Sequence, residues 1–177
     1  MRQSMKIAIQ VLLAALGPCS EAAEHINLHD VSNKWEEFRA PTGVQKMMES
    51  LVKKELAECI EYSPEATERD RLEKRIFSAV RINLRSRGEQ TFLVVSPPSC
   101  EGLRGTHAIS YWILQMTPTH KLQVLLKSAD DEIQLEDSRN KGYRDISTFY
   151  GTSSTCRYRF NGHHYKPVTA TKKDQYL

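Results

Sequence analysis

A thiol and an imidazole that lie close together in the sequence are the first residues that could perform chemistry. Cys100 precedes His107 by seven residues, Glu101 follows the cysteine directly, and His120 is a second histidine within reach of the same loop. A cysteine activated by a histidine base and oriented by an acid is the arrangement of a thiol hydrolase. No helix start follows Cys100 to favour its thiolate. We therefore expect a protein that is not an enzyme and keep a small envelope thiol hydrolase, using Cys100 with His107, as the alternative.

Arginines alternate along one predicted strand and recur next to two aromatic residues near the C-terminus. Arginine and aromatic side chains are enriched in protein interfaces. We therefore expect a face that binds an acidic protein loop or an anionic polymer of the cell envelope. A solvated sheet face without a partner is the other interpretation of the same pattern. The residues expected to form the binding face are Arg81, Arg85, Arg87, Arg157, Tyr158 and Arg159.

Three cysteines follow the N-terminal segment, at positions 59, 100 and 156. In an oxidising compartment this number favours one disulfide and one unpaired thiol. We predict a bond between Cys100 and Cys156, because both lie where a predicted strand meets a loop. The rival pairing uses Cys59, which continues the buried side of a predicted helix, and leaves Cys156 free.

The helix that precedes these strands is predicted from its apolar spacing. Thr42 and Gln45 have the spacing of a capping box, in which each side chain satisfies a backbone N–H of the other residue. Apolar residues then recur about every 3.6 positions up to Cys59, which is typical of an amphipathic helix packed on a core. Ser63 precedes a proline and is expected to end the helix. The stripe expected to face the core is Val44, Met48, Leu51, Glu55 and Cys59.

From Ile76 the apolar period changes from helical spacing to two, the period of a strand. Strands are expected over residues 76–85, 91–96 and 108–116, and short alternating runs separated by turn residues continue to residue 165. Such runs are typical of an antiparallel meander. The predicted fold class is therefore α+β, with an N-terminal amphipathic helix packed on an antiparallel meander sheet of about six strands.

Two segments of this meander, NKGYRDI (140–146) and YRFNGHHY (158–165), carry a resemblance to a known group. They resemble the "N-G-Y-x-D-I … Y-x-F-D-G-x-x-Y" ending of many small exported bacterial proteins of unassigned role. That ending is itself similar to a degenerate FG-GAP repeat of the integrin-propeller type. The resemblance covers about a quarter of the chain. It implies an exported protein with a C-terminal hairpin.

The resemblance raises the question of calcium, because FG-GAP repeats place a D-x-[DN]-x-[DN]-G-x-x-D loop around the ion. Here Asp137 occupies the first place of such a loop, but Arg139 and Lys141 occupy the third and fifth places. Two cations at ligand positions would repel a hard dication, so we expect no metal and no cofactor. Instead, Asp145 is expected to accept hydrogen bonds from the amides of the turn, with Arg139 or Lys141 supplying positive charge. The predicted structural turn consists of Asn140, Gly142 and Asp145.

The N-terminal segment, residues 1–23, has the form of a secretory signal peptide. Two cations, Arg2 and Lys6, precede an apolar run from Ile7 to Leu16, and small residues follow. This order is that of a cleaved leader, and the run is shorter than the roughly 20 residues that a membrane helix needs. We expect residues 24–168 to form a single α+β domain and residues 169–177 to form a polar tail.

Net charge gives little information about a partner. The formal charge is +3, from 25 Lys and Arg against 22 Asp and Glu. This value is too close to neutral to favour nucleic acid or insertion into an anionic membrane. We therefore expect a periplasmic or secreted binding protein of the inhibitor or immunity type, which contacts another envelope or secreted protein and is peripheral to the membrane at most. A structural envelope protein is the further alternative.

Overall fold

The computed structural model describes residues 23–62, 66–74, 77–85, 89–97, 100, 103, 108–151 and 153–168. The predicted signal peptide up to residue 22, the predicted polar tail, Arg87 and His107 lie outside the described residues.

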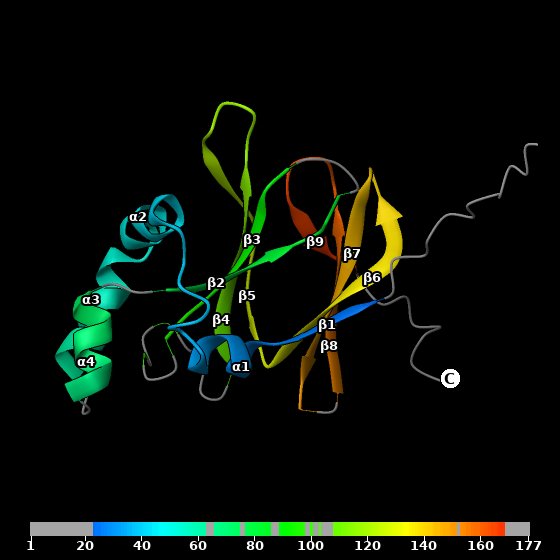
Figure 1. Cartoon of the computed structure of the whole chain (residues 1–177). Coiled ribbons are helices and arrows are strands. Elements are labelled where there is room, and N and C mark those ends of the chain that lie inside the picture. The colour runs from blue at the N-terminus through cyan, green and yellow to red at the C-terminus, as the bar shows by residue number, and fades with distance from the viewer. Residues whose placement is uncertain are drawn as a thin grey trace, which may run out of the picture.

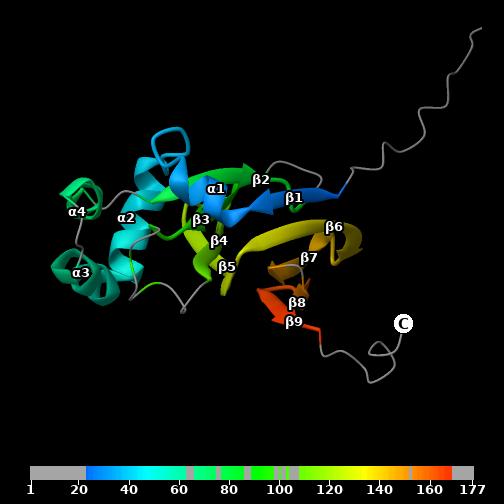
Figure 2. The same cartoon turned by 90° about the horizontal axis from the view of Figure 1, so that it is seen from below.

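The described residues form three layers, with helices on one side of a four-stranded sheet and a five-stranded sheet on its other side (Figure 1). The view from below shows the same order, with the helices of residues 42–73 at one end and the strands of residues 132–167 toward the other (Figure 2). All strand pairs are antiparallel.

The helices are α1 (Leu28–Asn33), α2 (Thr42–Leu51), α3 (Lys53–Tyr62) and α4 (Ala66–Glu73). The four-stranded sheet has the order β2 (Ser78–Ile82), β3 (Thr91–Val95), β4 (Ile109–Met116), β5 (Leu122–Asp130). The five-stranded sheet has the order β1 (Glu24–Asn27), β6 (Glu132–Asn140), β7 (Tyr143–Tyr150), β8 (Ser153–Phe160), β9 (Tyr165–Pro167).

The prediction of one helix packed on a single meander sheet is wrong. The described residues contain two sheets, and β5 and β6, although consecutive, belong to different ones. The reason lies at Asp131, the only residue between these two strands. A period of two identifies strands but does not say which strands pair.

Asp131 fixes this corner through both its backbone and its side chain. Its N–H donates to the carbonyl of Phe149 (2.9 Å) and its carbonyl accepts from the N–H of Leu28 (2.9 Å). Its carboxylate accepts from the backbone N–H of Gly151 (2.8 Å) and lies 3.1 Å from the His29 ring nitrogen. The corner is therefore bonded to α1 and to the β7–β8 hairpin, so that the chain turns away from the four-stranded sheet.

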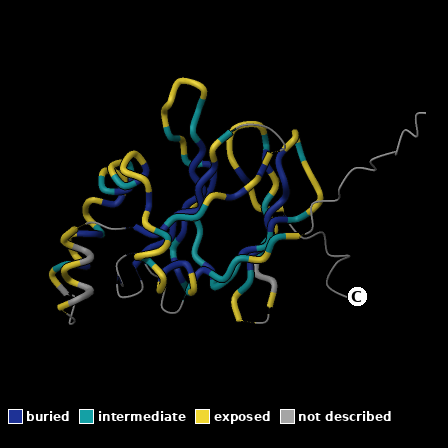
Figure 3. The backbone as a smooth tube through the Cα atoms, viewed as in Figure 1, coloured by how far each residue is buried: buried dark blue, intermediate teal, exposed yellow. Residues whose placement is uncertain are grey.

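The four-stranded sheet is buried on both faces (Figure 3). All five residues of β3 are buried, and the four from Phe92 to Val95 alternate between two apolar clusters. Leu93 and Val95 face the five-stranded sheet and form, with residues of that sheet and α1, what we call the sandwich core. Phe92 and Val94 face α2 and α3 and belong to what we call the helix-side core. Burial on both faces explains the continuous apolar character of β3.

The long predicted helix is two helices, because Val52 leaves the helical conformation between them (φ −120°, ψ 32°). The buried residues also differ from the predicted stripe. Val52 and Leu56 are buried at 1% and 3% exposure, whereas Leu51 is 45% exposed. The change of direction at Val52 turns the following residues, so that a stripe drawn for one straight helix does not hold.

The predicted capping box is also absent. Pro41 is the N-cap of α2 and no side chain caps this end. The Gln45 side chain instead accepts a hydrogen bond from the backbone N–H of Phe77 (3.0 Å). This bond ties the first turn of α2 to the segment that enters β2.

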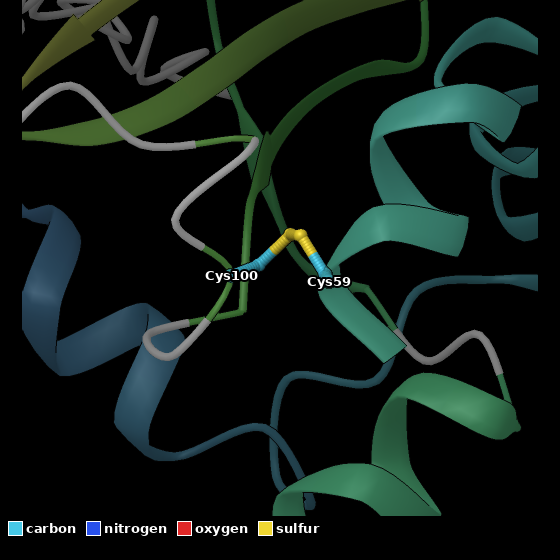
Figure 4. The surroundings of a disulfide bond; sticks show 2 residues. All are labelled: Cys59 and Cys100. Carbon is cyan, nitrogen blue, oxygen red and sulfur yellow. A yellow bond between two sulfur atoms is a disulfide. The ribbon is translucent and has the colours of Figure 1, made fainter. Parts of the chain in front are cut away.

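The disulfide joins Cys59 to Cys100, with 4.9 Å between the two Cα atoms (Figure 4). The predicted Cys100–Cys156 bond is therefore wrong, and Cys156 on β8 is free, as in the rival pairing. Cys59 and Cys100 both lie in the helix-side core. Cys156 is in the other sheet, which explains why two cysteines at strand ends do not meet.

The disulfide closes a loop of 41 positions across α3, α4, β2 and β3. We predict that Cys59→Ser/Cys100→Ser lowers the free energy of unfolding by about 4 kcal/mol, because the unfolded chain gains the entropy of an open loop. Urea unfolding measures this, and Cys156→Ser is the control with the smaller expected effect. Non-reducing peptide mapping that linked Cys156 to either other cysteine would contradict the pairing.

Candidate functional site

The predicted binding residues do not form one face. Arg81 lies on β2 of the four-stranded sheet, while Arg157 and Arg159 lie on β8 of the other sheet. Tyr158 packs against the sandwich core, and its hydroxyl lies 3.1 Å from that of Ser128. Alternation along a strand places its two arginine neighbours on the opposite, outer face. Arg85, which follows β2, lines the cavity described below, and it is the one residue of the set to do so among those that the structure describes.

The Asp145 carboxylate is the centre of a cluster of polar side chains on the outer face of the five-stranded sheet. It is 1% exposed, and one carboxylate oxygen accepts from Ser138 Oγ (3.0 Å) and Arg157 Nη2 (3.1 Å). Arg159 Nη2 lies 3.5 Å from the same oxygen. Asp145 therefore pairs with two arginines of the neighbouring strand. The prediction that it caps the amides of the preceding turn is wrong.

The NKG turn is a two-residue hairpin between β6 and β7, in which Asn140 pairs with Tyr143. The positive φ angles belong to Lys141 (51°) and Gly142 (85°), as a type I′ turn requires. Asn140, which was predicted as a residue of this turn, lies outside the two-residue loop. Instead, it extends β6 and its amide donates to the carbonyl of Phe160 (2.6 Å). The turn is thus bonded to the end of β8.

Arg139 and Lys141 do not supply the positive charge next to Asp145. Arg139 Nη1 donates to the carbonyl of Leu84 (3.2 Å), and Lys141 Nζ donates to the carbonyl of Asn161 (2.6 Å). The positive charge opposite Asp145 comes from β8 instead. Among the residues that the structure describes, no group of three or more His, Cys, Asp and Glu side chains lies close enough together to hold a metal ion.

A cavity of about 430 Å³ opens where the NKG turn, the β8–β9 turn and the base of the β4–β5 hairpin meet. We call it the hairpin cavity. Its chemistry comes from six of its lining residues: Arg85, Glu89, Gln115, Lys141, Tyr143 and His163.

The floor of the hairpin cavity is a hydrogen-bonded network centred on Glu89. The Tyr143 hydroxyl donates to Glu89 Oε2 (2.9 Å), and Gln115 Nε2 donates to the same oxygen. Arg85 Nη1 donates to Glu89 Oε1 (2.8 Å), so both carboxylate oxygens are engaged. Burial raises the pKa of Tyr143, which keeps its hydroxyl a donor. The floor is thus a fixed polar surface between the two sheets.

Two cations, Arg85 and Lys141, stand at the rim beside the two glycines of the NKGYRDI and YRFNGHHY segments. The Arg85 guanidinium lies over the Tyr143 ring, 5.5 Å from its centroid. A Cβ at Gly142 would lie 3.8 Å from Arg85 Nε, and one at Gly162 would lie 3.2 Å from Lys141 Nζ. Gly162 also has a φ of 112°, which side chains rarely adopt. The contact at Gly162 would crowd Lys141, whereas 3.8 Å at Gly142 is an ordinary van der Waals distance, so the turn conformation of Gly142 (φ 85°) rather than Arg85 favours glycine there.

The alternative of a thiol hydrolase requires a free sulfur on Cys100. Cys100 is fully buried and bonded to Cys59, so its sulfur is not a free nucleophile. His120 is exposed at the tip of the β4–β5 hairpin. The hairpin cavity offers hydrogen-bond donors from Arg85 and Lys141, while its carboxylate is already engaged by neighbours. A polar or anionic group of a partner matches these donors.

Sequence patterns missed most of this cavity. The NKGYRDI segment contains Lys141, but the resemblance gives Lys141 no role beyond the turn. No sequence motif marks Glu89 or Gln115 as a residue of a functional site, since a single acid after a turn and a glutamine at a strand end are common. Their meeting with Tyr143 depends on how the two sheets pack.

Comparisons with known proteins give no relative. No protein-family model matches the chain, nor does any curated protein or solved structure. The resemblance to exported proteins with an FG-GAP-like hairpin thus stays a hypothesis. Within the described residues, no helix has both the length and the apolar composition needed to span a membrane.

We predict that Asp145→Ala lowers the free energy of unfolding by about 1.5–3 kcal/mol, because charge-assisted bonds to a buried carboxylate are lost. Chemical unfolding measures the change, and Asp137→Ala, at a largely exposed carboxylate, is the control. Millimolar calcium should leave the melting temperature unchanged. A calcium-dependent stabilisation that Asp145→Ala abolishes would show that this face holds an ion.

We also predict that alkali unfolds the protein through its buried tyrosines. Burial raises the pKa of Tyr111, Tyr143, Tyr158 and Tyr165 above the ordinary value near 10. Below about pH 10 both folded and unfolded chains keep these phenols protonated, so stability is unaffected. Above it the unfolded chain releases protons first, and stability should fall by up to about 1.4 kcal/mol per pH unit for each tyrosine.

Phenolate absorbance and circular dichroism test this prediction together. Part of the absorbance should rise near pH 10 while the fold persists, and the rest should appear only as the fold is lost. Complete ionisation with an intact fold would contradict it. Tyr143→Phe should remove one of the phenols that ionise only as the fold is lost. This variant therefore assigns part of the late absorbance to Tyr143.

Proposed function

We propose that this is an exported binding protein of the inhibitor or immunity type, which acts by contacting another protein of the cell envelope. The observation that carries the proposal is the β4–β5 hairpin, whose tip extends beyond the rest of the domain (Figure 1). Its tip is exposed while its base is buried (Figure 3). An exposed loop on a rigid base is a usual place for recognition residues.

The tip of this hairpin is held in one conformation by its own hydrogen bonds. The Thr117 N–H donates to the carbonyl of Lys121 (2.7 Å), and its hydroxyl accepts from the Lys121 N–H (3.1 Å). The His120 N–H donates to the Thr117 carbonyl (2.9 Å). A loop that is ordered before binding loses less entropy when it binds. This feature supports recognition by insertion into a partner's cleft.

The hairpin cavity lies at the base of the same hairpin and supplies charged groups beside it. Met116, Thr117 and Pro118 line it together with Arg85 and Lys141. A partner that receives the tip would therefore meet a cationic rim next to it. Complementary charge at such a rim favours association rate and specificity. Export itself is supported by the disulfide, since such bonds persist in oxidising compartments.

The proposal is tested by affinity capture from envelope and secreted fractions of the producing cell, with the full chain as bait. We predict that the wild-type protein retains one protein in stoichiometric amount. Thr119→Arg should abolish this capture, because it places a long cationic side chain at the exposed tip. The captured protein, if it is a wall-degrading enzyme or toxin as the inhibitor type requires, should lose activity when mixed with wild type.

The matched control is Ser153→Arg, which puts the same side chain at an exposed position of the β7–β8 hairpin at the opposite end of the domain (Figure 1). It should capture the partner as well as wild type does. Equal capture by Thr119→Arg, or no captured protein at all, would contradict the proposed function.

A further inference from the structure

A second cavity, of about 290 Å³, lies between the start of α2 and the edge strand β2. We call it the α2 cavity. Met116 lines both the α2 cavity and the hairpin cavity. Since Met116 is the last residue of β4, the two cavities flank the base of the projecting hairpin.

The wall of the α2 cavity is mainly apolar. Phe92 and Val44 belong to the helix-side core and are 5% and 1% exposed, while Ala79 and Met116 are partly exposed. Gly43 in the first turn of α2 adds no side chain, and a Cβ there would meet no heavy atom within 4 Å. The cavity therefore presents apolar surface next to open space.

Two arginines complete this cavity, and none of the described residues that line it is acidic. Arg81 lies over the Phe92 ring, with its guanidinium carbon 6.0 Å from the centroid. Arg39 is fixed by backbone pairing with Ser78. Both arginines are exposed, and no ion pair to either is present within the described part of the chain. The cavity thus carries two positive charges that form no ion pair with any residue that the structure describes.

We infer that the α2 cavity binds a segment of the partner protein in which an apolar side chain stands next to a carboxylate. The apolar side chain would contact Phe92 and Val44, and the carboxylate would pair with Arg39 and Arg81. The volume lies at the small end of the roughly 300–1,000 Å³ range of ligand cavities, which suits one side chain. The shared Met116 places this contact beside the hairpin, so the inference rests on the proposed function for the nature of its partner.

The probe for this inference is 3-phenylpropionate, which joins an aromatic ring to a carboxylate. Titration into the isotopically labelled full chain, followed by NMR, should shift the resonances of residues around the α2 cavity. The neutral analogue 3-phenylpropionamide should bind at least about tenfold more weakly, because it lacks the charge that the arginines recognise.

Three variants separate this site from the rest of the surface. Gly43→Leu should fill the cavity and abolish probe binding, and it is expected to fold because the site is open and leucine is a good helix former. Arg81→Gln should weaken probe binding several-fold. Lys166→Gln, at an exposed cation on β9 of the other sheet, should leave it unchanged.

The inference is overturned if the amide binds as well as the carboxylate, if Gly43→Leu retains wild-type affinity, or if the probe does not bind. Decanoate binding far more tightly than 3-phenylpropionate would also overturn it, because the site would then suit a lipid. If the probe does not bind but Thr119→Arg still abolishes capture of the partner, only this inference is overturned. If the probe binds but the Thr119→Arg variant captures the partner as well as wild type does, only the proposed function is overturned.

Discussion

Burial of both faces of the four-stranded sheet is the constraint on which the other elements depend. Each large side chain withdrawn from water contributes roughly 1.5–3 kcal/mol, and β3 and β4 send such side chains to both sides. Phe92 and Trp112 face α2 and α3, whereas Leu93 and Ile113 face the five-stranded sheet. Both the helices and the five-stranded sheet are needed, because removing either would expose a continuous apolar surface of β3 and β4 to water. The Cys59–Cys100 bond holds the helical cover to the loop that follows β3.

The cavities lie where this two-sided cover ends. Beyond Met116 the hairpin continues without helices or a second sheet around it (Figure 1). At that boundary Gln115 of one sheet and Tyr143 of the other meet on Glu89. The polar network therefore joins the two sheets at the point where apolar packing gives way to solvent, and it holds Arg85 above the Tyr143 ring. The positions of the rim cations thus follow from how the layers pack.

Local patterns predicted the strands well and their arrangement poorly. The apolar runs predicted as strands over residues 91–96 and 108–116 correspond to β3 and β4, because a short apolar run bounded by turn residues is typical of a buried strand. The corner at Asp131 depends on partners in α1 and the β7–β8 hairpin, which no short window contains. The same holds for the disulfide, since the choice between Cys59 and Cys156 was decided by which layer lies over Cys100. Of the predicted binding residues that the structure describes, Arg85 alone lines the hairpin cavity, because residues of one type need not share a face when the chain folds into two sheets.

The position of β1 has a consequence for the order in which the molecule can assemble. This strand pairs only with β6, and the Asn27 side chain bonds Glu132, 105 positions further along the chain. During synthesis the first ordered strand therefore has no partner until most of the domain has been made. Contacts between segments so far apart in sequence slow folding, because the closing of a long loop precedes the stabilising contact. The five-stranded sheet can therefore take up its N-terminal strand only after β6 has been made.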